Sequence, residues 1–367
     1  MTQKARVIAF YLPQFYPTDI NNKWYGNGFT EWTNVRKAKP LFKGHYQPRI
    51  PTDLGYYDLR YPDTRQHQAQ LAEEAGIEGF CYYHYWFGEG RRELEIPFNE
   101  ILRLGKPDFP FCLCWANQSW YSKFWNKDTD REDKLIIEQL YDSPEWVAKH
   151  FYSLLAAFRD SRYIKVDGKL LFMIYRPLEY PDIKKFIAHW RLLAMENQLN
   201  DFYFVGQAVN EAQASKILEL GLDGVNIVRM NDFLHEFKYN NLFIKAFNKL
   251  QRFLQMAPYH YDYKKISKYF IKPNGMELRE NVFPTLIPNW DHSPRSGKSG
   301  LVFYDSTPEN FSVHLSKALN IVENKPDRQK IIFLKSWNEW GEGNYIEPDL
   351  KYGKGFLKIL RIFLSNN

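Results

Sequence analysis

Short apolar runs recur along this chain, and the segments between them repeat their apolar residues every three or four positions. The runs show little alternation of apolar and polar residues, which is typical of parallel strands covered on both faces. They predict strands at residues 7–12, 79–85, 111–115, 170–175, 203–206, 224–228, 283–287 and 331–335. The segments between and after them predict helices at residues 63–75, 93–104, 144–160, 182–198, 211–220, 232–255, 308–323 and 356–363.

Eight strand–helix units in this order predict an α/β fold, a (β/α)8 TIM barrel that forms a single catalytic domain over residues 1–367. Two segments depart from the repeating pattern. Residues 18–60 form a long connection after the first strand, punctuated by glycine and proline, which we expect to fold over the barrel mouth. Residues 231–281 form a basic, aromatic insertion within the barrel.

The insertion carries an excess of positive charge. Residues 235–272 contain eight lysines and arginines but only two acidic residues, Glu236 and Asp262. Phe243 and Phe247 have the spacing of one helix face. A basic amphipathic helix can lie on an anionic membrane surface, which would suit a lipid-linked glycan, whereas a helix packed on the barrel is the alternative.

Composition and charge exclude several other classes of protein. The chain is 44% hydrophobic and 25% charged, and its net charge of +6 comes without an arginine-rich stripe or nucleic-acid-binding motif, so we expect no nucleic-acid partner. Three cysteines argue against a disulfide framework, and Cys112 and Cys114 are spaced to face one packed side of a strand. No apolar stretch reaches the ~18 residues of a membrane span, so we expect a cytoplasmic protein, membrane-associated only through the insertion.

Polar and aromatic residues follow most of the predicted strands. In a (β/α)8 barrel the working side chains lie at the carboxyl ends of the strands. Aromatic residues make up 17% of the chain, and their flat faces can cover the C–H faces of a sugar ring. The predicted substrate-binding residues are Tyr11, Gln14, His84, Tyr85, Trp115, Asn117, Gln118, Tyr175, Arg176, Trp337, Asn338, Trp340 and Glu347.

The candidate catalytic residues follow the last predicted strand. Glu339 and Glu342 flank Gly341, and a turn at this glycine would let both carboxylates face the barrel axis. Cleaving a glycosidic bond requires one carboxyl that carries a proton and one that stays ionised. We assign Glu342 as general acid/base and Glu339 as the carboxylate at the reactive side of the sugar, with Glu347 in reserve.

Several motifs of this chain, in one order, resemble those of the WbsX-type proteins of bacterial O-antigen and capsule gene clusters, which are related to glycoside hydrolase family 99. The last of these motifs, Trp337-Asn338-Glu339-Trp340-Gly341-Glu342, resembles the catalytic turn of family 99. The resemblance covers roughly residues 5–200 and 330–350. The other motifs are Tyr11-Leu12-Pro13-Gln14-Phe15, Gly28-Phe29-Thr30-Glu31-Trp32, Gly44-His45-Tyr46-Gln47-Pro48, Gly79-Phe80-Cys81-Tyr82-Tyr83-His84-Tyr85-Trp86 and Trp115-Ala116-Asn117.

The resemblance implies a (β/α)8 barrel and retaining cleavage of an α-mannoside-type bond in a bacterial surface polysaccharide, without a metal or other cofactor. The family's Glu-x-x-Glu pair maps onto Glu339 and Glu342. In the family's route the first glutamate takes the proton of the sugar's 2-hydroxyl to give a 1,2-anhydro sugar, and the second protonates the leaving group. This chain departs from the family by carrying Gln118 and Asn126 where acids are usual, which puts the identity of the sugar in doubt.

Two other functions remain open from the sequence. A glycosyltransferase could use the Asp128-Thr129-Asp130 triplet to hold a divalent ion on a nucleotide sugar, although no buried strand precedes this triplet. A non-catalytic glycan-binding protein would keep the aromatic residues but need no paired acids.

Overall fold

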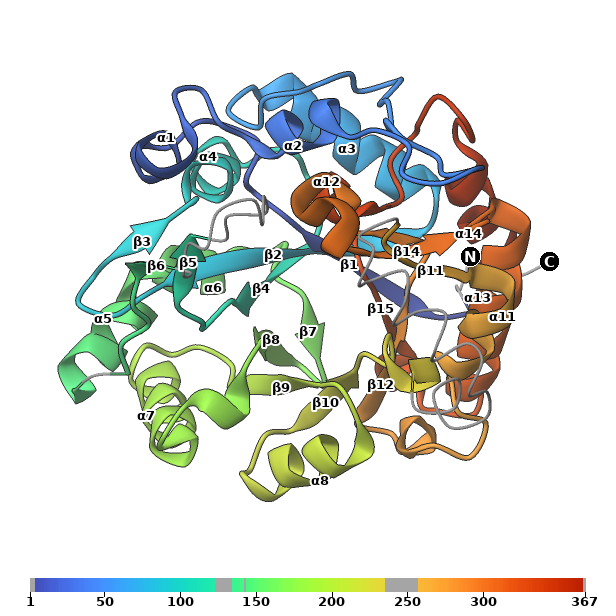
Figure 1. Ribbon diagram of the computed structural model, residues 1–367. Coiled ribbons are helices and arrows are strands. Elements are labelled where there is room, and N and C mark those ends of the chain that lie inside the picture. Colours follow the sequence, from blue (N-terminus) through green and yellow to red (C-terminus); the bar gives the residue numbers. More distant parts are fainter. Residues whose placement is uncertain (1–3, 123–133, 142, 235–256, 366–367) are drawn as a thin grey trace.

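A closed barrel of eight parallel strands forms the centre of the protein (Figure 1). The computed structural model describes residues 4–122, 134–141, 143–234 and 257–365. Each strand pairs in parallel with the next, and the last pairs with the first to close the ring. The strands are β1 (Arg6–Tyr11), β2 (Ile77–Trp86), β4 (Phe111–Trp115), β8 (Lys169–Ile174), β9 (Phe202–Ala208), β10 (Gly224–Ile227), β12 (Val282–Leu286) and β15 (Ile331–Leu334). The predicted (β/α)8 barrel and all eight predicted strands are therefore confirmed.

Helices surround the barrel, largely where the periodicity predicts them (Figure 1). The predicted helix at 144–160 is divided into two helices at Leu154. The predicted helix at 93–104 begins only at Ile96, and residues 92–93 form the short strand β3 (Arg92–Glu93) before it. Of the predicted helix at 232–255, residues 232–234 are helical and the rest lies outside the described residues. The outer helices are α3 (Pro62–Glu74), α4 (Ile96–Leu104), α5 (Pro144–Ser153), α6 (Leu155–Phe158), α7 (Ile183–Glu196), α8 (Glu211–Glu219), α13 (Pro308–Val322) and α14 (Gly355–Leu364).

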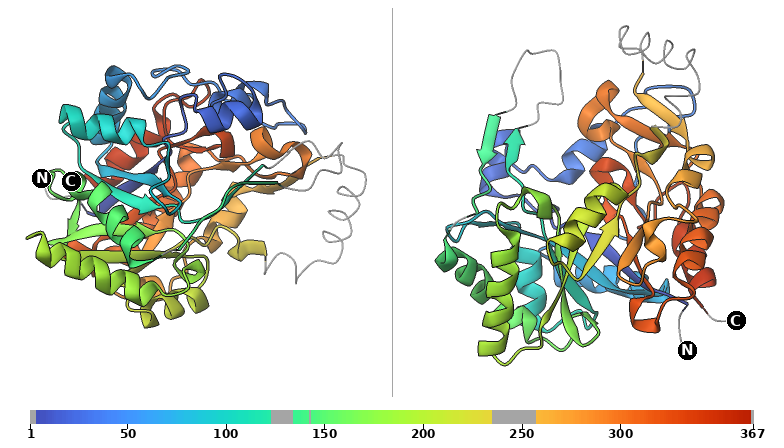
Figure 2. Two further views of the ribbon diagram at one scale, coloured as in Figure 1. Left: turned by 90° about the vertical axis from the view of Figure 1, so that its left-hand side faces the viewer. Right: turned by 90° about the horizontal axis from the view of Figure 1, so that it is seen from below.

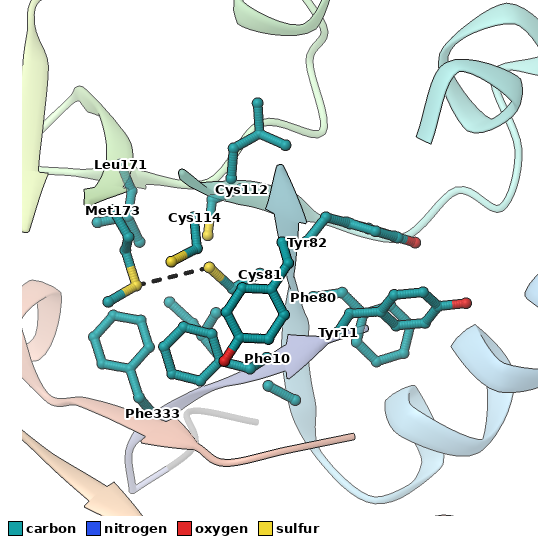
Figure 3. Packing of buried hydrophobic residues seen from close by; sticks show 14 of the residues in the cluster. Phe10, Tyr11, Phe80, Cys81, Tyr82, Cys112, Cys114, Leu171, Met173 and Phe333 are labelled. Carbon is teal, nitrogen blue, oxygen red and sulfur yellow. Dashed lines mark hydrogen bonds between the residues drawn. The ribbon is translucent and has the colours of Figure 1, made fainter. Parts of the chain in front are cut away.

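Alternate side chains of each barrel strand point in opposite directions. Phe10 of β1 stacks inside the barrel on Tyr83 and Phe333, with ring centroids 5.5 and 5.6 Å apart. The Sγ of Cys81 lies 3.7 Å from the Sδ of Met173 in the same interior, and the other two thiols lie nearby (Figure 3). The interior is thus filled with buried apolar side chains and leaves working positions only at the strand ends.

The carboxyl ends of the strands are covered by smaller elements. The long connection after β1 contributes two short helices, and residues 120–122 pair antiparallel with residues 134–137. The described part of the insertion forms a three-stranded sheet with the segment after β12, over a second buried cluster that includes Phe233, Tyr263 and Phe303. These elements are α1 (Asp19–Tyr25), α2 (Glu31–Lys37), β5 (Trp120–Ser122), β6 (Lys134–Ile137), β11 (Tyr259–Asp262), α11 (Tyr263–Ile266), β13 (Trp290–Asp291), α12 (Ser293–Ser296), β14 (Leu301–Tyr304), β16 (Asn338–Glu339) and β17 (Asn344–Tyr345).

The start of β1 and the end of α14 lie side by side, where the Lys4 amide donates a hydrogen bond to the Leu364 carbonyl at 3.1 Å. They lie at the opposite end of the barrel from strands β5 and β6 (Figure 2). Within the described ranges, every helix is too short or too polar to cross a membrane.

The packing of α7 against the barrel provides a test of the core. Trp190 is fully buried, with its ring 4.7 Å from Phe172 and 5.4 Å from Phe202, whereas Leu192 on the same helix is 48% exposed. We expect Trp190→Ala to lower the free energy of unfolding by about 3–5 kcal/mol, because it leaves a cavity. Leu192→Ala is the control and should change it by less than ~0.5 kcal/mol. Urea denaturation followed by circular dichroism would measure both, and equal effects would contradict this packing.

Candidate active site

A cavity of 280 Å³ opens at the carboxyl ends of the barrel strands. Glu339 and Glu342 both line it, together with residues from β2, the first connection and the segment after β12. The two candidate catalytic glutamates and four of the predicted substrate-binding residues therefore meet in one cavity. Those four are Gln14, Tyr85, Gln118 and Tyr175.

The turn after β15 directs both glutamates into the cavity. β16 and β17 pair antiparallel, and a 3-10 turn over Trp340–Glu342 joins them. The Ser336 hydroxyl accepts a hydrogen bond from the Glu339 amide at 3.1 Å and donates one to the Asn344 carbonyl at 2.7 Å. Gly343 closes the turn with a φ of 55°, a conformation that favours glycine.

Arg295 of α12 lies between three carboxylates. Its Nη1 is 2.6 Å from Glu342 Oε1 and 3.5 Å from Glu339 Oε1. Its Nη2 is 3.0 Å from Glu31 Oε2. Lys335 adds a second cation, with its Nζ 3.8 Å from Glu339 Oε2. The two candidate catalytic carboxylates thus share one guanidinium group.

The two glutamates hold their protons differently. Burial and the charge of Glu342 raise the pKa of Glu339, and the cations Lys335 and Arg295 oppose them, which leaves this pKa at about 7. Burial also acts to raise the pKa of Glu342, but Arg295 and a hydrogen bond to His292 hold it well below its usual range. The surroundings therefore move the two pKa values in opposite directions, and the pKa of Glu339 is the one that lies near neutral pH.

Aromatic side chains form the walls of the cavity. The rings of Tyr85 and Trp120 meet edge to face at 5.2 Å, and those of Tyr83 and Tyr175 at 6.1 Å. Such surfaces can cover a sugar ring while their polar edges reach its hydroxyls.

A second cavity of 410 Å³ adjoins the first, and both are lined by Gln14, Tyr25, Gln118 and Trp120. Arg176 lines this outer cavity and pairs with Glu179 at 3.1 Å. The two cavities therefore meet at a shared wall. Its polar lining is rich in amide and hydroxyl groups, from Gln14, Asn21, Gln118 and Ser119.

Three other predicted substrate-binding residues lie on the outer face of the barrel strands. The Tyr11 hydroxyl donates a hydrogen bond to Gln68 of α3 at 2.6 Å. The Nε2 of His84 lies 2.8 Å from that of His150 on α5, and the Trp115 indole donates to the Trp86 carbonyl. Each occupies an outward position of the strand alternation, so none lines the cavity.

Five further predicted residues are buried and hold the loops in place. Three of them are Asn117, Trp337 and Asn338. Asn117 bonds the backbone of Arg176, and Asn338 bonds both backbone groups of Leu12, at 2.8 and 3.0 Å. Trp337 packs on Phe80, with ring centroids 5.2 Å apart. The side-chain amides of Asn117 and Asn338 are thus bonded to the backbone, and Trp337 is fully buried.

Glu347 and Trp340 form one buried unit behind the catalytic turn. The Trp340 indole donates to Glu347 Oε2 at 2.6 Å, and Tyr57 and Gln68 donate to the same carboxylate at 2.9 and 2.7 Å. Trp340 also stacks on Tyr345 at 3.6 Å. Neither side chain lines the cavity, so the reserve candidate lies behind the turn and supports it.

Several cavity residues were not predicted as site residues, notably Arg295. Nothing in its local sequence marks it, since only the fold brings α12 beside the catalytic turn. Glu31 and Lys335 carried a weak signal, because one lies in a family motif and the other ends a predicted strand. The remaining members include Tyr25, Tyr83, Trp120 and His292.

The Gly44–Pro48 motif anchors the first connection to the catalytic turn. His45 Nε2 lies 2.8 Å from Asp291 Oδ2, and Gln47 donates to the same oxygen at 2.7 Å. Arg49 donates to the Gly343 carbonyl at 3.4 Å. This buried cluster holds together the two segments that carry Glu31 and Arg295.

No group of three or more histidine, cysteine, aspartate or glutamate residues with metal-binding geometry occurs among the residues that the structure describes. The Asp128-Thr129-Asp130 triplet and Asn126 lie outside those residues.

Comparisons with known proteins agree with the motifs. A family model described as "Glycosyltransferase WbsX" matches residues 7–360, which includes the stretch between residues 200 and 330 that the motifs leave out. Proteins described as "Uncharacterized protein WxcX", from two strains of Xanthomonas campestris pv. campestris (B100 and ATCC 33913), are 32% identical over 372 aligned positions. The alignment covers 99% of this chain and 50% of theirs, so the chain spans half the length of these curated relatives.

Solved structures share the fold at low sequence identity. A "Glycoside hydrolase-like protein" has a TM-score of 0.60 at 15% identity, over 99% of this chain and 94% of its own. A GH99 endo-alpha-mannosidase from Bacteroides thetaiotaomicron, in complex with BIS-TRIS-propane, has a TM-score of 0.56 at 15% identity, over 99% and 97%. Both likenesses support the (β/α)8 fold, and the predicted resemblance to WbsX proteins and family 99 is confirmed.

Gly341 should be essential to the packing of this turn. A Cβ at this position would lie 1.9 Å from Glu31 Oε2 and 2.9 Å from Arg295 Nε. We expect Gly341→Ala to lower the free energy of unfolding by about 1–3 kcal/mol, because the buried ion pair must move. In the double variant Glu31→Ala/Gly341→Ala the clash with the Glu31 carboxylate is absent, so the two effects should be less than additive in a denaturation cycle. Strict additivity would contradict the contact.

Glu347 should make stability depend on pH. Burial raises the pKa of Glu347 and hydrogen bonds from Trp340, Gln68 and Tyr57 oppose the rise, which leaves this pKa at about 7. The folded protein then holds a proton that the unfolded chain releases, so this contribution is lost as pH rises from about 4.5 to 7.

Relative to Glu347→Gln, the wild type should lose stability over this pH window, by about 3 kcal/mol at most. Urea denaturation at several pH values would measure the difference. Glu219→Gln on the exposed face of α8 is the control and should give a flat difference. A flat difference for Glu347→Gln as well would show that this carboxyl is ionised throughout.

Proposed function

This chain belongs to the family described as Glycosyltransferase WbsX, and we propose that it is a polysaccharide-processing enzyme that acts on glycosidic bonds. Specifically, it would be a retaining glycoside hydrolase or transglycosylase for a bacterial surface polysaccharide such as O-antigen or capsule. The observation that carries the proposal is the pair Glu339 and Glu342, buried in one cavity and 3.5 and 2.6 Å from the same Arg295 nitrogen.

The pair supplies the two charge states that glycosidic chemistry needs. One carboxyl can hold a proton near neutral pH while the other is held ionised beside a guanidinium group. In the route of the resembling family, the 2-hydroxyl loses its proton to one glutamate as its oxygen bonds to the anomeric carbon. The bond to the leaving oxygen breaks as the second glutamate protonates that oxygen.

The shape of the site favours an oligosaccharide as substrate. The aromatic walls and the outer cavity, which adjoins the first, give room for neighbouring sugars. The fold likeness to a GH99 endo-alpha-mannosidase supports an α-mannoside-type bond as the first linkage to test.

Contact with a lipid-linked glycan through residues 235–272 stays a prediction. Much of that segment lies outside the described residues. In its described part, Lys264, Lys265 and Lys268 are exposed, as a surface that meets anionic headgroups would require.

A glycosyltransferase is the second candidate, because the family description names that activity. A non-catalytic glycan-binding protein would not explain two buried carboxylates around one guanidinium group. Incubation with the repeat-unit glycan of the source strain, followed by mass spectrometry and NMR of the anomeric configuration, would test hydrolysis. Parallel incubations with nucleotide sugars, with and without EDTA, would test transfer.

The paired glutamates give the direct test of this function. We expect Glu339→Gln and Glu342→Gln each to lower turnover of the natural glycan by about 10²–10⁴-fold, since each amide removes a proton-transfer group. Both variants should still bind the glycan in calorimetry. Glu219→Gln should keep wild-type turnover. A glutamine variant at either site that keeps more than about a tenth of the activity would exclude that residue's role.

A further inference from the structure

Two charged side chains of the cavity lie close together without being bonded to each other. The Nζ of Lys335 is 3.8 Å from the Oε2 of Glu339, which is beyond hydrogen-bond distance. Both residues line the cavity, and their side chains are only 8% and 10% exposed. Buried polar atoms are ordinarily hydrogen-bonded, so the gap between these two needs an explanation.

Neither atom at this gap has a hydrogen-bond partner among the described residues. The Oε2 of Glu339 is buried and unbonded. The Lys335 ammonium group interacts with its neighbours through charge, chiefly that of Glu339, and no hydrogen bond to it is formed within the described ranges. An ammonium group has three N–H donors and a carboxylate oxygen is an acceptor. The gap therefore has free donors on one side and a free acceptor on the other.

Arg295 is also a cation of this cavity, but its donors already have partners. Its Nη1 donates to Glu342 at 2.6 Å, and its Nη2 and Nε lie 3.0 and 3.2 Å from Glu31 Oε2. Of the lysines and arginines that line the cavity in the described part of the chain, Lys335 is thus the one whose donors are left for a bound molecule.

Packed elements hold Lys335 and Glu339 at this separation. The Lys335 amide donates a hydrogen bond to the Leu286 carbonyl at 2.9 Å, which joins the end of β15 to β12. The Nζ of Lys335 lies 5.7 Å from the ring centroid of Trp290, within the range of a cation–π contact. The Glu339 amide is bonded to the Ser336 hydroxyl. The gap is therefore a preformed feature of the site.

A single hydroxyl group fits this gap. Hydrogen bonds to a hydroxyl oxygen are about 2.7–3.0 Å long, so an oxygen slightly to one side of the line between the two atoms can be bonded to both. It would accept a hydrogen bond from Lys335 Nζ and donate its own hydrogen to Glu339 Oε2. A carboxylate in the same place would be repelled by Glu339, so the gap disfavours an acidic group of the substrate.

We propose that Lys335 is a further catalytic residue, which binds one hydroxyl of the substrate together with Glu339 and stabilises the negative charge that develops as Glu339 removes its proton. A fixed positive charge beside a developing negative charge lowers the barrier to the reaction. Burial acts to lower the pKa of Lys335, but the nearby charges, that of Glu339 foremost, hold it above its usual range, so the amine remains a donor. The identity of the hydroxyl rests on the proposed function, in which it is the 2-hydroxyl beside the anomeric carbon.

The reaction balances with Lys335 protonated throughout. The 2-hydroxyl gives its proton to Glu339 as its oxygen bonds to the anomeric carbon, and Glu342 protonates the leaving oxygen as the old bond breaks. In the second half, Glu342 takes a proton from the attacking water or acceptor hydroxyl as that oxygen bonds to the anomeric carbon. The C1–O2 bond opens and O2 recovers its proton from Glu339, which restores both glutamates.

The alternative role for Lys335 is that of a counter-ion, which would only lower the pKa of Glu339. Loss of a counter-ion would move the ionisation of Glu339 to higher pH but leave the full rate above that pH. Loss of a residue that binds the reacting hydroxyl lowers the rate even where Glu339 is fully ionised. The groups that act on Glu339 are Glu31, Tyr83, Tyr85, Arg295, Lys335 and Glu342.

The pH dependence of kcat/KM on a panel of α-glycosyl fluorides separates these two roles. Fluoride leaves without a proton, so the rate of its release depends on the base and not on the general acid. A fluoride-selective electrode would follow the release. For the wild type we expect kcat/KM to rise as pH passes about 7, where Glu339 loses its proton, and then to reach a plateau.

Lys335→Met should lower this plateau by about 10²–10³-fold, which is typical for the loss of a donor to a developing anion. It should also move the rise to higher pH, because the cation that lowers the pKa of Glu339 is lost. On the natural glycan kcat should fall with little change in KM, since the contact strengthens in the transition state. A plateau within about tenfold of the wild type would show that Lys335 is only a counter-ion and would overturn the proposal.

Lys325→Met is the matched control. Lys325 is also buried and lies 5.5 Å from the ring centroid of Phe283, but its Nζ donates to the Val282 carbonyl at the other end of the barrel. The folded control variant should keep the wild-type plateau. Lys335→Gln retains a donor without the charge, and it serves as the readout if circular dichroism shows that Lys335→Met does not fold. It should lose at least about tenfold, and a wild-type plateau would overturn the proposal.

The same assays keep this inference separate from the proposed function. Turnover of any of these glycosides by the wild type supports the glycosidase function, independently of the result for Lys335→Met. If the wild type accepts only the natural glycan, the plateaus are compared on that substrate by the same criteria. Inactivity of the wild type on every fluoride and on the natural glycan would overturn the function and, with it, the catalytic role of Lys335.

Discussion

The placement of one guanidinium group between three carboxylates controls the chemistry available to this protein. A buried carboxylate without a partner would be costly, and a buried arginine without one equally so. Arg295 satisfies Glu31 and Glu342 together, and the remaining acid, Glu339, lies beside the cavity without a hydrogen bond for one of its oxygens. The side chains of Glu339 and Glu342 are chemically identical, so the opposite shifts of their pKa values result from their surroundings.

The barrel supplies the rigidity that this arrangement needs. Its interior is packed with rings and sulfur-containing side chains, so the strand ends are fixed relative to one another. The loops are then fastened to those ends by buried polar groups, of which Asp291 and Asn338 are the clearest cases. Several residues that were predicted from the sequence to bind sugar instead hold the loops in place.

The fold could be predicted from the sequence because buried parallel strands consist of nearly continuous apolar runs. The site could be read only in part. His84 and Trp115 were placed in it because they end strands, yet the two-residue alternation turns them outward. Cys112 and Cys114 were expected to share one face of their strand, and the structure shows that this face points inward, which leaves Trp115 on the outer face. Arg295 gives no such signal, because its place in the site depends on contacts with Glu31 and Glu342, which lie 264 and 47 positions away in the sequence.

The closure of the ring between β1 and β15 has a consequence for biosynthesis. Strand β1 pairs with β15, which lies more than 300 residues later in the chain, and Arg6 is opposite Ile331. A chain emerging from the ribosome must therefore keep an open hydrophobic edge until the final strand arrives, which exposes it to chaperones and to aggregation. The turn that carries Glu339 and Glu342 follows that strand directly, so it can reach its place at the barrel mouth only as the ring closes.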